Sequence, residues 1–125
     1  MTGTITDEFR LKFDKACRLQ TEGATDSALN ILFELELSDS GPMAPVIGMI
    51  GQLLYYKKND PEKALDYLFR SSKMSPKSER TSLALFHALF DLNRIDEAFD
   101  EMRRFMSLSD SREYRTLLSD LNRDE

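Results

Sequence analysis

One spacing is repeated around three alanines, Ala28, Ala64 and Ala98, and this repeat constrains the fold more than any other feature of the chain. The second and third alanines are 34 residues apart, and the first and second are 36 apart. A large apolar residue stands nine positions before each alanine and another stands four positions after it: Leu19, Tyr55 and Leu89, then Leu32, Leu68 and Met102. Five positions before each alanine the chain has a residue that readily adopts the left-handed conformation at a helix end, namely Gly23, Asn59 and Asn93. The spacing therefore predicts one helical unit repeated three times.

The middle copy resembles a tetratricopeptide repeat, which is a helix–turn–helix unit of about 34 residues. Tyr55, Ala64 and Pro76 stand where that family has tyrosine, alanine and proline. The resemblance implies an all-α fold, a helical-hairpin solenoid in which three repeats are followed by a C-terminal capping helix. We expect residues 1–125 to form a single domain, with repeats at about 9–42, 45–78 and 79–112 and the capping helix at about 111–123.

Local residue patterns mark several helix ends independently of the family. Asp60 followed by Pro61 is typical of an N-cap and a first helical residue. Thr25, Ser78 and Asp110 each precede a further helical segment and are candidate N-caps.

Apolar patterns predict how two of the helices pack. Tyr114, Leu117, Leu118 and Leu121 form one stripe on the last helix, which predicts that this helix covers the third hairpin. The helix at about 45–57 is apolar nearly all round, and Gly48 and Gly51 interrupt it at about 1 kcal/mol each relative to alanine. We interpret the two glycines as points where a neighbouring helix needs room.

Composition and charge narrow the possible partners. The net charge of −5 argues against nucleic acid, because phosphate binding needs a basic surface. The longest nearly apolar run has 14 residues, well below the roughly 20 that a membrane-spanning helix needs. The N-terminus has no basic and apolar pattern of a signal peptide, and a single cysteine suits a reducing compartment. We therefore expect a cytoplasmic protein with no membrane insertion.

Candidate catalytic residues are scarce, so we expect no enzymatic activity. His87 is the only histidine and Cys17 the only cysteine, which leaves no metal-ligand set and no thiolate–imidazole pair. We interpret His87 as a partly buried or groove-lining residue that makes a hydrogen bond, and Cys17 as a packing residue. No glycine-rich phosphate loop is present, and we predict no cofactor and no metal.

Three acidic pairs of the second helices are interpreted as solvated surface. They are Glu34, Glu36, Asp96, Glu97, Asp100 and Glu101. Two pairs, Asp66 with Arg70 and Asp100 with Arg104, have the spacing of stabilising i,i+4 ion pairs on an exposed helix.

The resemblance also implies a binding surface, because the first helices of tetratricopeptide repeats line a concave groove. The positions that line it predict these partner-binding residues: Arg10, Phe13, Cys17, Met49, Leu53, Tyr56, Lys57, Arg80, Leu83, His87 and Phe90. The same positions include Gln20, Thr21, Val46 and Asp91. In one groove type of the family, Lys and Asn grip a C-terminal carboxylate, and at the corresponding positions here only Arg80 has a suitable side chain.

We therefore expect a non-catalytic protein–protein interaction module that holds an extended or helical segment of a dedicated partner through apolar anchors. An adaptor, a secretion-type chaperone and a toxin-neutralising immunity protein all remain open. The alternative is a self-assembling structural protein, such as a homodimer, whose groove is closed by a symmetry mate or by its own C-terminal helix.

Overall fold

The structure, a computed structural model, describes residues 6–123, and these residues form seven α-helices with no strand among them. The helices are α1 (Asp7–Thr21), α2 (Thr25–Ser38), α3 (Met43–Tyr56), α4 (Pro61–Met74), α5 (Glu79–Asp91), α6 (Ile95–Leu108) and α7 (Arg112–Arg123). The predicted all-α class is confirmed. No helix in the described part of the chain combines the length and the apolar character that crossing a membrane requires.

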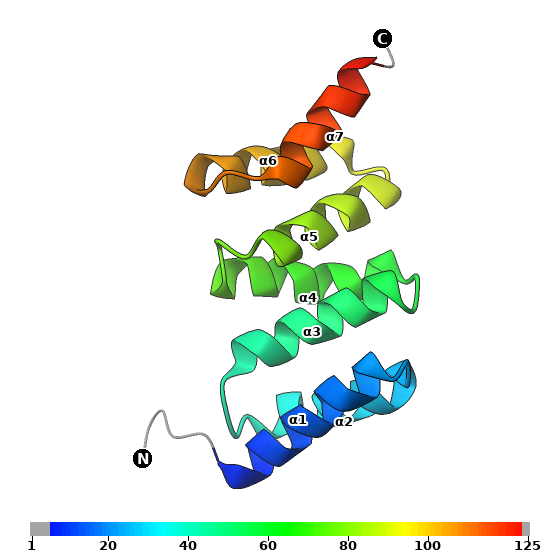
Figure 1. Cartoon of the computed structure of the whole chain (residues 1–125), viewed down its shortest axis with the longest axis vertical. Coiled ribbons are helices and arrows are strands. Elements are labelled where there is room, and N and C mark those ends of the chain that lie inside the picture. Colours follow the sequence, from blue (N-terminus) through cyan, green and yellow to red (C-terminus); the bar gives the residue numbers. More distant parts are fainter. Residues whose placement is uncertain (1–5, 124–125) are drawn as a thin grey trace.

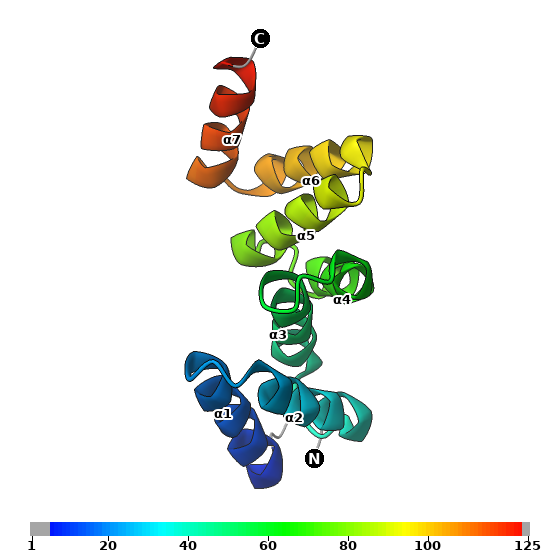
Figure 2. The same ribbon diagram turned by 90° about the vertical axis from the view of Figure 1, so that its right-hand side faces the viewer.

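The helices follow one another in a row along the long axis of the molecule (Figure 1). Short connections join α1 to α2, α3 to α4 and α5 to α6, so that each of these pairs forms a helical hairpin. Each helix from α1 to α5 packs on the next one in the chain, and α3 also packs on α5. In Figure 2, α1 and α3 lie to the left of their hairpin partners α2 and α4. The first helices of neighbouring hairpins therefore share one side of the row.

The three repeated alanines lie in the core of their hairpins. Ala28, Ala64 and Ala98 are each fully buried, and their small side chains let the two helices of a hairpin approach closely. The apolar residues four positions after them, Leu32, Leu68 and Met102, are also buried. The repeated spacing thus corresponds to repeated core packing.

The turns within the hairpins have the left-handed backbone that the sequence predicts. The φ angles are +85° at Gly23, +50° at Asn59 and +62° at Asn93. A fourth left-handed residue, Asp39 with φ +47°, ends α2 and was not predicted. Asparagine and aspartate are the non-glycine residues that tolerate this conformation best.

The predicted helix caps are confirmed at two positions and wrong at two. The side chains of Asp60 and Ser78 accept hydrogen bonds from the backbone N–H groups of the first turns of α4 and α5. Thr25 is instead the first residue of α2, because the backbone turn from Gly23 makes Ala24 the N-cap. At the start of α7 it is Ser111 that accepts from the N–H of Tyr114, at 3.1 Å, and not Asp110.

Gly48 and Gly51 are close-approach points, as predicted. A Cβ atom added at Gly51 would lie 2.9 Å from Cδ2 of Leu68 on α4 and 3.3 Å from the backbone nitrogen of that residue. A Cβ atom at Gly48 would lie 3.2 Å from Oγ of Ser71. The two glycines therefore let α3 and α4 pack at short range, which offsets their low helix propensity.

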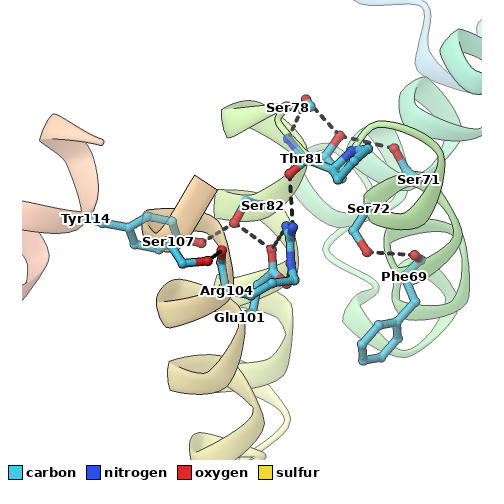
Figure 3. Close-up of polar contacts among 11 residues, drawn as sticks. Phe69, Ser71, Ser72, Ser78, Thr81, Ser82, Glu101, Arg104, Ser107 and Tyr114 are labelled. Carbon is cyan, nitrogen blue, oxygen red and sulfur yellow. Dashed lines mark hydrogen bonds and ion pairs between the residues drawn. The ribbon is translucent and has the colours of Figure 1, made fainter. Parts of the chain in front are cut away.

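A buried polar network fastens α7 to the third hairpin (Figure 3). Oγ of Ser82 on α5 donates to Oε2 of Glu101 on α6 at 2.6 Å, and it lies 2.6 Å from the hydroxyl oxygen of Tyr114 on α7. Because the single hydroxyl hydrogen of Ser82 goes to the carboxylate, Tyr114 is the donor in the second bond. Burial raises the pKa of the Tyr114 hydroxyl, so the hydroxyl stays protonated and able to donate.

Glu101 was predicted to be a solvated surface residue, and this prediction is wrong. Its side chain is 7% exposed, and Arg104 binds it through two hydrogen bonds of 2.7 Å each. Arg104 also donates to the backbone oxygen of Pro76, at 3.0 Å, so the pair reaches the turn before α5. The predicted Asp100–Arg104 pair is not formed, because Arg104 binds Glu101 and Asp100 binds Arg103. The predicted Asp66–Arg70 pair is formed, at 3.7 Å.

The apolar stripe of α7 covers the third hairpin only over its first two turns, where Leu117 is also partly buried against the core. Tyr114 is fully buried against Phe86 and Phe105, with ring centroids 5.7 and 5.9 Å away. Leu118 and Leu121, further along the stripe, are each 38% exposed. Figures 1 and 2 both show the C-terminal half of α7 extending beyond α6. This half of the helix has no hairpin beneath it.

Candidate partner-binding cleft

A cleft of about 430 Å³, here called the main cleft, crosses the side of the row that carries α1, α3 and α5. It is lined by residues of these three helices and of the end of α4 and the turn after it: Phe13, Gln20, Ala44, Pro45, Gly48, Met49, Gln52, Leu53, Tyr56, Lys57, Ser71, Ser75, Ser78, Arg80 and Thr81. Four of the seven described helices, α1, α3, α4 and α5, therefore contribute to one surface, and three of them are the first helices of consecutive hairpins.

Apolar side chains form the floor of the main cleft. Leu53 is buried in the core, and Met49 and Phe13 are partly buried against it. Phe13 is held in place by the ring of Phe9, which stacks on it with a centroid distance of 5.9 Å. Tyr56 remains 48% exposed above this floor. Such a combination of buried support and an exposed aromatic side chain is typical of residues that anchor a partner.

One wall of the main cleft is polar, and sequence reasoning missed it. Ser71 and Thr81 are buried and their hydroxyl oxygens lie 3.1 Å apart, while Ser78 donates to Thr81 at 3.2 Å. Gly48 has no Cβ atom, and a Cβ atom at this position would lie close to the hydroxyl oxygen of Ser71. The glycine therefore leaves Ser71 accessible from the cleft. The sequence signal was the run of hydroxyl residues around the turn between α4 and α5, together with the glycine opposite.

Two cations, Lys57 and Arg80, border the main cleft. Both side chains are exposed, and none of the ion pairs within residues 6–123 includes either of them. No acidic residue lines the cleft, although the chain as a whole has a net charge of −5. Burial raises the pKa of Tyr56, and the nearby Arg80 acts in the opposite direction. The cleft is thus a positively charged region on an acidic protein.

A smaller hollow of about 250 Å³, here called the small pocket, adjoins the main cleft and shares Tyr56 with it. Its lining residues are Tyr55, Tyr56, Asn59, Pro61, His87 and Asp91. His87 is half-buried there, with its ring edge-on to Phe86 at 5.4 Å, and no hydrogen bond is found for its side chain within the described residues. His87 therefore lines a hollow beside the main cleft, and the hydrogen bond predicted for it has no partner among residues 6–123.

The structure brings seven of the eleven predicted partner-binding residues to these two hollows. Six of them line the main cleft, namely Phe13, Met49, Leu53, Tyr56, Lys57 and Arg80, and His87 lines the small pocket. The other four line neither hollow: Arg10, Cys17, Leu83 and Phe90. Val46, which occupies a groove position in the repeat pattern, is fully buried in the core.

Cys17 and Phe90 line neither hollow. Burial, and then the charge of Asp14, raise the pKa of the Cys17 thiol, which disfavours a reactive thiolate. The ring of Phe90 is 40% exposed and stacks on Phe86 with a centroid distance of 5.9 Å. Phe90 therefore packs on a neighbouring ring of α5, and Cys17 is a partly buried thiol.

Comparison with models of known protein families finds no match, and comparison with curated proteins finds no similar sequence. The likeness to tetratricopeptide repeats therefore rests on the spacing of residues within this chain.

Proposed function

We propose that this protein is a non-catalytic binding module that holds a segment of a partner protein in the main cleft. One observation carries the proposal: an apolar floor open to solvent lies beside two cations that have no ion-pair partner among the described residues. Apolar surface that stays exposed in a folded chain is typical of a binding site.

The chemistry of the main cleft indicates the kind of segment that fits. Met49 and Tyr56 offer adaptable and aromatic contact area, which suits an apolar side chain of the partner. Lys57 and Arg80 then suit a carboxylate next to that side chain. The partner segment is therefore proposed to be a protein segment in which an apolar anchor is flanked by acidic residues.

The role of such a module is proposed to be that of an adaptor, a secretion-type chaperone or an immunity protein within the tetratricopeptide class. The acidic composition and the single cysteine support a cytoplasmic location. Affinity purification from the native cell with mass spectrometry identifies the partner and separates these three roles.

Replacing Tyr56 with alanine is expected to weaken partner binding about 5- to 30-fold, because an exposed aromatic anchor over a buried floor contributes about 1–2 kcal/mol. Arg80→Glu should mainly slow association and change its salt dependence, since an exposed charge at the edge steers the partner. Phe90→Ala should have a smaller effect than Tyr56→Ala, because Phe90 lines neither hollow. Surface plasmon resonance with the purified partner measures all three effects.

The control for these variants is Asp66→Ala on α4, outside the cleft, where the carboxylate is 78% exposed. Its binding should equal that of the unmodified protein. If Asp66→Ala abolishes binding while Tyr56→Ala is folded and binds normally, the proposal is wrong and the acidic surface of the second helices is the binding site.

A second candidate function, self-assembly, is supported by the exposed apolar residues near the C-terminal end of the row. Leu108, Leu118 and Leu121 are 47%, 38% and 38% exposed, and no residue of α7 lines the main cleft. Light scattering of the purified protein distinguishes the two candidates. A stable homodimer that Leu118→Glu dissociates would favour self-assembly, whereas a monomer would favour a separate partner.

A further inference from the structure

The small pocket differs in charge from the main cleft that it adjoins. Its one formally charged lining group, apart from the titratable His87, is the carboxylate of Asp91, whereas the main cleft has only Lys57 and Arg80. Tyr56 lines both hollows and therefore stands at the boundary between them. A segment that crosses this boundary would meet positive charge on one side and negative charge on the other.

The carboxylate of Asp91 is positioned but not neutralised. The Tyr55 hydroxyl donates to Oδ2 of Asp91 at 2.6 Å, and this bond joins α3 to α5. Oδ1 takes no part in it. None of the ion pairs within residues 6–123 involves Asp91, and the residue is exposed at the end of α5. Burial, followed by the bond to Asp91, raises the pKa of Tyr55, so this hydroxyl remains a donor at neutral pH.

Aromatic rings stand next to this carboxylate. Tyr55 and Tyr56 pack edge to face, with ring centroids 4.9 Å apart, so their planes are steeply inclined to each other. The electron-rich face of a tyrosine ring attracts a cation, and a guanidinium can stack on such a face while it donates to a carboxylate. The pocket volume of about 250 Å³ is below the range typical of drug-sized ligands and suits one side chain.

We propose that the small pocket is a subsite for an arginine side chain, whose guanidinium binds the free oxygen of Asp91 and packs on the tyrosine rings. The inference rests on the proposed function, because the arginine belongs to the segment held in the main cleft. An acidic residue of the segment is then bound by Lys57 and Arg80, and its arginine is bound by Asp91. Together these two contacts fix the direction in which the segment lies.

The test uses N-acetyl-arginine methylamide as a probe, titrated into the isotope-labelled full chain and followed by backbone amide shifts. Saturable shifts are expected at Asn59, His87 and Asp91. N-acetyl-citrulline methylamide, which has nearly the same shape but no charge, should bind about fivefold more weakly or worse, and the lysine analogue should fall between them. No saturable shift, or equal binding of citrulline, overturns the proposal.

Asp91→Asn provides the matched variant, because asparagine can still accept the bond from Tyr55. It should weaken arginine binding about fivefold, while Asp120→Asn on the exposed face of α7 should leave binding unchanged. Equal affinity of Asp91→Asn and the unmodified chain overturns the subsite.

The probe needs no partner protein, so this result is separate from the proposed function. If the arginine probe does not bind but Tyr56→Ala still weakens partner binding, only the subsite is wrong. If the arginine probe binds specifically but Tyr56→Ala leaves partner binding unchanged, only the proposed function is wrong.

Discussion

Tyr114→Ala is expected to lower the free energy of unfolding by about 3–5 kcal/mol, the usual cost of truncating a buried aromatic residue. Tyr114 is fully buried, and its ring contacts Phe86 and Phe105. Its hydroxyl is also the donor to Ser82, so truncation removes both the packing and one bond of the buried network. Urea denaturation followed by far-UV circular dichroism measures the loss.

Two conservative variants separate packing from hydrogen bonding. Tyr114→Phe should cost about 1–2 kcal/mol, since it keeps the ring and removes a buried donor. Tyr67→Phe removes a hydroxyl that donates to Glu36 at 2.9 Å in a part-buried position, and it should cost less. A loss below about 1 kcal/mol for Tyr114→Ala would mean that α7 is not fastened to the third hairpin as described.

Glu101→Ala is expected to cost about 2–4 kcal/mol, because it removes the centre of the buried network. The variant leaves the Ser82 hydroxyl without its acceptor and Arg104 without its ion-pair partner. The cost falls below that of a fully buried ion pair because the Arg104 side chain is 35% exposed and can be hydrated.

Glu97→Ala is the matched control for Glu101→Ala. Glu97 lies on the same helix and forms an i,i+3 ion pair with Arg94, but its side chain is 48% exposed. Its loss should cost no more than about 1 kcal/mol, as for other exposed pairs. Equal urea midpoints for the two variants would contradict the assignment of Glu101 to a buried network.

The features that could be predicted from sequence are those with one local cause. The left-handed turns at Gly23, Asn59 and Asn93 were predictable because few residue types tolerate positive φ. The buried alanines were predictable because a close helix contact needs a small side chain at a fixed spacing from the turn. Both kinds of feature depend on a short stretch of chain.

The features that could not be predicted depend on residues far apart in sequence. The sequence of α6 alone predicts that Glu101 lies at the surface. Its burial depends on its hydrogen bond with Ser82 of α5, which also bonds to Tyr114 of α7. The polar wall of the main cleft likewise needs α3 and α4 at close range before Ser71 faces the cleft across Gly48.

The candidate site could be predicted only in part, because it also depends on contacts between helices that are far apart in sequence. Repeat positions on α3 predict Met49, Leu53 and Tyr56 at the groove, and all three line the main cleft. The same positions predict Leu83 and Phe90, which line neither hollow, because only the start of α5 reaches the main cleft and Phe90 packs on Phe86. A repeat pattern predicts which side of each helix faces the groove, but it does not predict the length over which neighbouring helices stay in contact.

Site-specific photo-cross-linking tests most directly whether the main cleft is the surface that holds the partner. A photoreactive benzoylphenylalanine replaces Lys57 at the edge of the cleft in one variant and Asp66 on α4 in the other, so that each variant loses one exposed charge. Our proposal predicts that the partner is cross-linked from position 57 and not from position 66. Cross-linking from position 66 that equals or exceeds that from position 57 would contradict it.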